Sequence, residues 1–145
     1  GMRHSPISPQ YSKVNLQPGW RKWMLFSDFT VSGPGGLGYA AGSGGAVTQL
    51  TSKATSVTLN KTNGQITMNA AALASGTAVQ FILNNSTIAA TDNVIVTANF
   101  SGAVYTAFAY SVAAGSCSIN VQQNSGGSRS DAVVLNFAVI KSVAA

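Results

Sequence analysis

This chain of 145 residues is poor in charge, cysteine and histidine. Its only cysteine is Cys117, so an internal disulfide is excluded, and we expect the thiol to lie buried as a small apolar group. Its only histidine is His4, close to the N-terminus. A serine–histidine–aspartate relay needs a histidine held by the fold, and a histidine metal site needs two or three ligands. We therefore predict neither kind of site.

Acidic side chains are equally scarce, with three aspartates and no glutamate. Asp92 lies in a TDN turn, where we expect its carboxylate to accept hydrogen bonds from nearby backbone. Asp131 follows Arg129 by two residues, and we expect the two to form an ion pair. Hydrolysis by paired carboxylates would need both aspartates. We therefore predict that the protein is not an enzyme and holds neither a cofactor nor a metal.

The formal net charge of +5 reflects missing acids more than clustered bases. The eight Lys and Arg residues are divided evenly between residues 1–36 and 37–145. Nucleic-acid binding needs a concentrated basic face, so we predict no nucleic-acid partner. No run of about 18 apolar residues is present, so no membrane span is expected. The stretch RHSPISPQYSK after Met2 lacks an apolar core, so we expect no secretory signal.

Three segments differ in composition and predict the domain organisation. Residues 1–31 form an aromatic and basic segment, residues 32–45 a glycine-rich linker with seven glycines, and residues 46–145 the folded domain. The first segment concentrates large apolar side chains, which would form a sticky surface if exposed. These side chains either pack on the protein itself or contact a partner, and the candidates are Trp20, Trp23, Met24, Phe26 and Phe29.

The folded domain shows the pattern of an all-β protein. Hydrophobic residues make up 46% of the chain, which is enough to bury a core. Apolar residues alternate with others in short runs about ten residues apart, with no strong helical pattern between them. Asn63-Gly64 separates two such runs and predicts the tip of a hairpin. We therefore predict an antiparallel β-sandwich of about eight strands with a jelly-roll-like arrangement.

Four stretches carry a resemblance to a known kind of module: VTQLTSKAT, NGQITMNAAALA, NSTIAATD and NFAVIK. The region from Gly42 to Lys141 resembles a module of tail-fibre-like virion proteins of bacteriophages and prophages. The resemblance implies a structural virion protein of tail-fibre or capsid-decoration type, assembled in a bacterial cytoplasm with other virion proteins. It also makes a host-surface glycan a candidate partner. A carbohydrate-binding module is the alternative function.

Two segments predict self-assembly, because both of their faces are apolar. In residues 132–140 only Asn136 interrupts the second face, and residues 103–112 likewise place Phe108, Tyr110 and Val112 opposite a row of mostly small residues. A sheet with one solvated face would alternate with polar residues instead. We predict a homo-oligomer. The preference for a trimer comes from the resemblance to fibre-like proteins. The alternative is that both strands are central in a sandwich and covered by loops.

Overall fold

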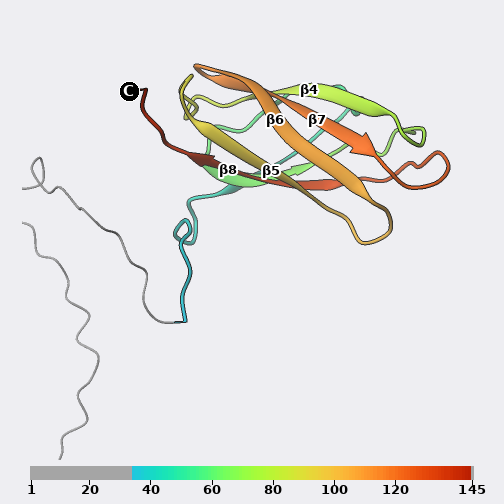
Figure 1. Cartoon of the computed structure of the whole chain (residues 1–145), viewed down its shortest axis with the longest axis horizontal. Coiled ribbons are helices and arrows are strands. Elements are labelled where there is room, and N and C mark those ends of the chain that lie inside the picture. The colour runs from blue at the N-terminus through green and yellow to red at the C-terminus, as the bar shows by residue number, and fades with distance from the viewer. Residues whose placement is uncertain (1–33, 145) are drawn as a thin grey trace, which may run out of the picture. The chain divides into compact units, whose positions relative to one another are not determined.

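The computed structural model describes residues 34–144, which form an all-β fold without a helix. Its compact unit begins at Gly38. Figure 1 shows the strands arranged in two layers. The eight strands are β1 (Gly45–Thr48), β2 (Val57–Thr58), β3 (Asn63–Thr67), β4 (Ala78–Asn84), β5 (Asn93–Asn99), β6 (Tyr105–Ala113), β7 (Ser116–Gln123) and β8 (Val134–Ile140). The predicted β-sandwich of about eight strands is confirmed.

Each layer is a four-stranded sheet, with the orders β1-β3-β8-β5 and β2-β4-β7-β6. The pairs β1–β3 and β2–β4 are parallel, whereas the other pairs are antiparallel, so both sheets are mixed rather than purely antiparallel. The jelly-roll-like arrangement stays a prediction. No helix in the described residues has the length and apolar character needed to cross a lipid bilayer.

The core lies between the sheets and follows from the two-residue period of the strands. Successive side chains of a strand point to opposite faces, so every second residue of β7 and β8 enters the core. The buried side chains of these strands are Cys117, Ile119, Val121, Leu135, Phe137 and Val139. The alternation in residues 79–83 likewise buries Phe81 and Leu83. Cys117 is 1% exposed, which confirms its expected burial.

The predicted hairpin at Asn63-Gly64 is wrong. Both residues lie inside β3, where they pair with Ala138 and Phe137 of β8, while β2 belongs to the other sheet. The chain between β2 and β3 therefore crosses from one sheet to the other. Gly64 is needed for close approach rather than for a turn, because a Cβ atom there would lie 2.4 Å from the carbonyl oxygen of Gly45 in β1. Its φ angle is not in the left-handed region.

The predicted faces of residues 103–112 also need correction at a β-bulge. The register of β6 with β7 shifts between Tyr110 and Ala113, and Ser111 has a φ of 49°. Phe108 and Tyr110 lie on the outer face, as their spacing predicts, but Val112 packs against the core. The extra residue of a bulge reverses the alternation beyond it. β8 is central in its sheet, whereas β6 is an edge strand.

The described part of the glycine-rich segment contacts strands β3 and β8 of the sandwich. The Tyr39 hydroxyl donates a hydrogen bond to the carbonyl oxygen of Val139, and Ser43 Oγ donates to Asn63 Oδ1 over 3.2 Å. Residues 34–41 are exposed. The domain boundaries proposed from composition stay a prediction, although β1 begins at Gly45, one residue before the expected start of the domain.

The close approach at Gly64 gives a test of the β1–β3 pairing. Gly64→Ala should destabilise the protein by about 1–3 kcal/mol, the usual cost of overpacking, because the new methyl group meets backbone that cannot rotate away. Gly126→Ala is the matched control, since a Cβ there has no atom within 4 Å. Urea unfolding of both variants measures the difference. Equal stability of the two variants would contradict the pairing of β1 with β3.

Candidate binding face

The five aromatic and apolar side chains proposed as partner contacts lie outside the described residues. They are Trp20, Trp23, Met24, Phe26 and Phe29. Their role in contacting a partner therefore stays a prediction. The described residues offer a different candidate, the outer face of the β2-β4-β7-β6 sheet.

Strand register brings six side chains together on this outer face. Two cross-strand rows run from β6 through β7 to β4. Residues directly opposite one another on a sheet face have neighbouring side chains. The first row is Phe108, Asn120 and Gln80, and the second is Tyr110, Ser118 and Ile82. We call these six residues the outer patch.

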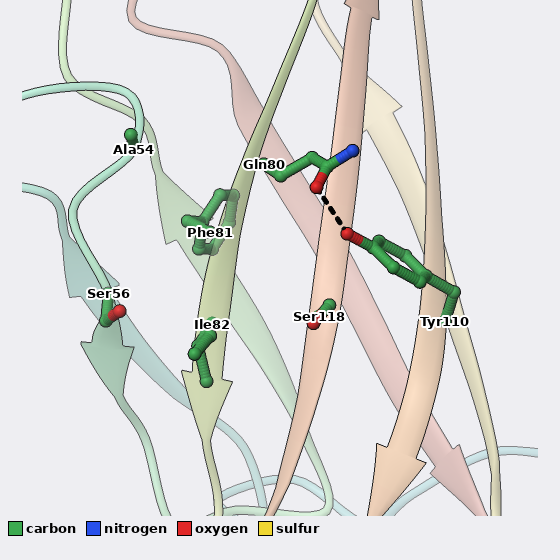
Figure 2. Close-up of a pocket in the computed structure, with 7 residues that line it drawn as sticks. All are labelled: Ala54, Ser56, Gln80, Phe81, Ile82, Tyr110 and Ser118. Carbon is green, nitrogen blue, oxygen red and sulfur yellow. Dashed lines mark hydrogen bonds between the residues drawn. The ribbon is translucent and has the colours of Figure 1, made fainter.

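An open depression with a volume of about 360 Å³ lies over the second row. Figure 2 shows Tyr110 reaching toward Gln80 across β7, with Ser56 and Ala54 on the other side of β4. The Tyr110 hydroxyl donates a hydrogen bond of 2.5 Å to Gln80 Oε1. This bond fixes the tyrosine ring and the amide relative to each other. The hydroxyl of Tyr110 and the amide of Gln80 therefore form one polar side of the depression.

Exposed apolar side chains lie next to Tyr110 and Gln80. Phe108 is 53% exposed and Ile82 is 46% exposed, although both are large apolar side chains. The rings of Phe108 and Tyr110 lie 6.0 Å apart between centroids and are tilted by 53°. Asn120, in contrast, is only 8% exposed. The outer patch thus combines aromatic and aliphatic surface with amide and hydroxyl groups, and none of its members is charged.

Asp92 makes structural contacts, as the sequence predicts. Its Oδ2 accepts a hydrogen bond of 2.8 Å from the backbone N–H of Ala89 and forms an ion pair of 2.6 Å with Lys141 Nζ. The hydrogen bond from Lys141, followed by the bond from Ala89, lowers the pKa of the Asp92 carboxyl. The carboxylate therefore stabilises the turn before β5 and links it to the end of β8.

Asp131 pairs with Arg129, which confirms the second expectation. Arg129 Nε lies 2.5 Å from Asp131 Oδ2, and the Tyr105 hydroxyl donates to the same oxygen over 2.8 Å. The hydrogen bond from Arg129 lowers the pKa of Asp131. Lys53 also contacts this loop, although its side chain is buried and only 4% exposed. Its Nζ donates hydrogen bonds to the backbone carbonyls of Asn69 and Asp131 over 2.6 and 2.5 Å. These residues tie three loops together before β8 begins.

The remaining reactive groups of the described residues also have structural surroundings. Burial raises the pKa of the Cys117 thiol to about 11, so the thiolate needed for nucleophilic attack is disfavoured. Residues 34–144 contain no group of three or more His, Cys, Asp or Glu side chains arranged to hold a metal ion.

Sequence patterns contained part of the signal for the outer patch. Alternation in residues 78–84 places Gln80 and Ile82 opposite the buried Phe81, so their exposure is predictable. The cross-strand neighbours of these residues depend on register, which the local pattern does not specify. The burial of Lys53 had no sequence signal, because a lone lysine in a polar stretch is typical of exposed loops.

Comparison with family models, curated proteins and solved structures finds no match to this chain.

The Asp92–Lys141 pair predicts a pH dependence of stability. Because folding lowers the pKa of Asp92 below its ordinary value of 3.8, its contribution is present above that pH and is lost as the pH falls through the lower, folded-state pKa. Asp92→Asn should therefore lower the melting temperature at pH 7, and the difference from the wild type should shrink as the pH falls through the folded-state pKa of Asp92. Thermal unfolding followed by circular dichroism measures it. A difference that does not vary with pH would contradict the ion-pair assignment.

Proposed function

We propose that this chain is a non-enzymatic structural protein of a bacteriophage virion, of tail-fibre or capsid-decoration type, with adhesion to the host surface as an accompanying role. It is assembled with other virion proteins in the bacterial cytoplasm. The resemblance of residues 42–141 to tail-fibre-like modules motivates the virion assignment. The described fold adds independent physical support.

The observation that carries the proposal is the distribution of charge over the fold. None of the eight strands contains Lys, Arg, Asp or Glu. Exposed sheet edges of natural proteins are commonly protected by charged side chains, among other features that oppose association with another chain. Uncharged sheet surfaces with exposed apolar side chains therefore favour a protein that works through surface contacts with neighbours.

The surroundings of the acidic side chains support a non-enzymatic role. The carboxylates of Asp92 and Asp131 each accept one hydrogen bond from a Lys or Arg side chain and another from a second donor. These hydrogen bonds lower the pKa of both carboxyls. A general acid or base at neutral pH needs a carboxyl pKa raised toward 7 instead. Their environment suits carboxylates that hold loops in place.

A carbohydrate-binding module is the second candidate function. The depression beside Tyr110 and Gln80 favours it, because small-molecule sites combine concave apolar surface with a few placed polar groups. The two candidates differ in context more than in chemistry: a virion protein with an adhesive face and a saccharide-binding module both need such a surface. Association with phage particles separates them.

The proposed self-assembly involves the outer face formed by β5 and β8. Ile95 and Ile140 are 50% and 49% exposed there, and Ala138 lies directly opposite Ile95. Beyond them the face becomes polar, with Gln65 Nε2 donating to Asn136 Oδ1 over 2.9 Å. An apolar area bordered by uncharged polar groups suits contact with a second copy of the chain. The trimer remains the favoured closed form.

We expect light scattering after size exclusion to give a mass of three times the 14.8 kDa of one chain at micromolar concentration. Ile95→Thr should lower this mass, because it places a hydroxyl in the apolar contact. Leu50→Thr is the matched control, since Leu50 is 84% exposed and lies outside the strands. A wild-type mass of one chain would contradict self-assembly, and equal masses of the two variants would place the contact elsewhere.

Gold-labelled antibodies against this chain should decorate the tails or capsids of phage particles from the bacterium that carries the gene. A virion component co-purifies with particles through a density gradient, so the label should follow them. An antibody against a cytoplasmic host protein is the control for adhering material. Particles without label, from cells that contain the chain, would contradict the virion assignment.

A further inference from the structure

We propose that the depression of the outer patch binds a neutral saccharide, with Gln80 and Tyr110 as its principal contacts. The proposal names the partner of the adhesive role described above and rests on that role. It is carried by three properties of the described residues: the absence of charge, the exposed apolar side chains and the hydrogen-bonding groups that face the depression.

The absence of charge selects a neutral ligand. The sheet strands β2, β4, β6 and β7 contain no Lys, Arg, Asp or Glu, and the other residues lining the depression, Ala54 and Ser56, are uncharged as well. The nearby Lys53 is buried and donates to the backbone carbonyls of Asn69 and Asp131. A phosphate, uronate or sialic acid would therefore lose its hydration without gaining an opposite charge.

The exposed apolar side chains suit the ring of a sugar. The C–H groups of one pyranose face form an apolar surface, and they carry a slight positive charge that favours the negative face of an aromatic ring. Tyr110 and Ile82 line the depression, and Phe108 lies next to Tyr110 on the same sheet face, outside the lining. Flat apolar groups of this size match a sugar ring better than a bulky aliphatic ligand, which needs a deeper pocket.

The polar groups around the rings suit the hydroxyls of a sugar. Tyr110 uses its hydrogen to donate to Gln80 Oε1, which orients the amide and leaves Gln80 Nε2 to donate elsewhere. Within residues 34–144, the side chains of Ser56, Ser118 and Asn120 have no hydrogen-bonding partner. Asn120 is nearly buried and lies between Gln80 and Phe108 in the first row, beside the depression and not in its lining. A hydroxylated ligand would satisfy these groups.

Binding of the purified full chain to an array of neutral and acidic oligosaccharides tests the proposal. The neutral probes are tetrasaccharides of glucose, galactose, mannose and N-acetylglucosamine, and the acidic probes are sialyllactose and tetragalacturonate. We expect binding to at least one neutral probe and weaker or no binding to the acidic ones. Binding restricted to acidic probes, or to none, would overturn the proposal.

Variants of the outer patch identify the binding site. Gln80→Leu keeps the size of the side chain and removes its amide, so the affinity for the bound neutral probe should fall at least about tenfold. Tyr110→Phe keeps the ring and frees the amide, so it should weaken binding less. Thr48→Val is the control, because Thr48 is exposed on β1 in the other sheet, at the edge opposite β5. Equal affinities for the Gln80 and Thr48 variants would overturn the assignment of the site.

The outcomes also separate this inference from the proposed function. If gold label follows the phage particles and the array shows no neutral binding, the saccharide site fails while the virion role stands. If the array shows binding that depends on Gln80 and the particles carry no label, the site stands and the carbohydrate-binding alternative replaces the virion role. If Gln80→Leu lowers the oligomer mass instead of saccharide affinity, the outer patch is covered by a second copy and the inference is overturned.

Discussion

The structure depends on one apolar layer between two sheets that contain no charged residue. The strands supply this layer from every second position, and the side chains at its centre, such as Ile119 in β7 and Leu135 in β8, have no exposed surface. Burial of each such side chain stabilises the fold by about 1.5–3 kcal/mol, so the layer outweighs the weak ion pairs of the surface. Charge is therefore needed only where the strands end and the backbone leaves the hydrogen-bonded sheets.

The ion pairs lie close to the ends of strands. Arg129 and Asp131 precede β8, whereas Lys141 follows it and reaches Asp92 before β5. The Asp92–Lys141 pair ties the loop before β5 to the end of β8, and Asp131 accepts a hydrogen bond from Tyr105 at the start of β6. Lys53 links two further loops from a buried position by donating to the backbone carbonyls of Asn69 and Asp131. Among the described residues, Lys53, Asp92 and Lys141 thus satisfy irregular backbone, which is costly to bury without partners. Both outer sheet faces are left uncharged.

Local patterns predicted what depends on neighbours along the chain and missed what depends on distant strands. Alternation in β4 and β7 identified the core, and the positions of Asp92 and Asp131 identified the contacts with Ala89 and Arg129, which are close in sequence. The distant partners Lys141 and Tyr105 were not predicted. Asn63-Gly64 has the composition of a hairpin turn, yet pairing with Phe137 and approach to Gly45 decide its conformation. The bulge at Ser111, which sends Val112 inward, likewise has no local composition signal.

The outer patch results from the packing of β6 against the core and from the β-bulge at Ser111. The inner face of β6 carries Tyr105, Ala107 and Ala109, which pack against the core, whereas Phe108 and Tyr110 alternate with them and are left on the outside. The bulge comes directly after Tyr110, so the ring remains on the outer face and its hydroxyl meets Gln80. Without charges, these exposed groups offer little electrostatic attraction to a charged ligand. A ligand that is both apolar and hydroxylated would cover these apolar side chains and also satisfy the neighbouring polar groups, which is the physical reason for proposing a neutral saccharide at the outer patch.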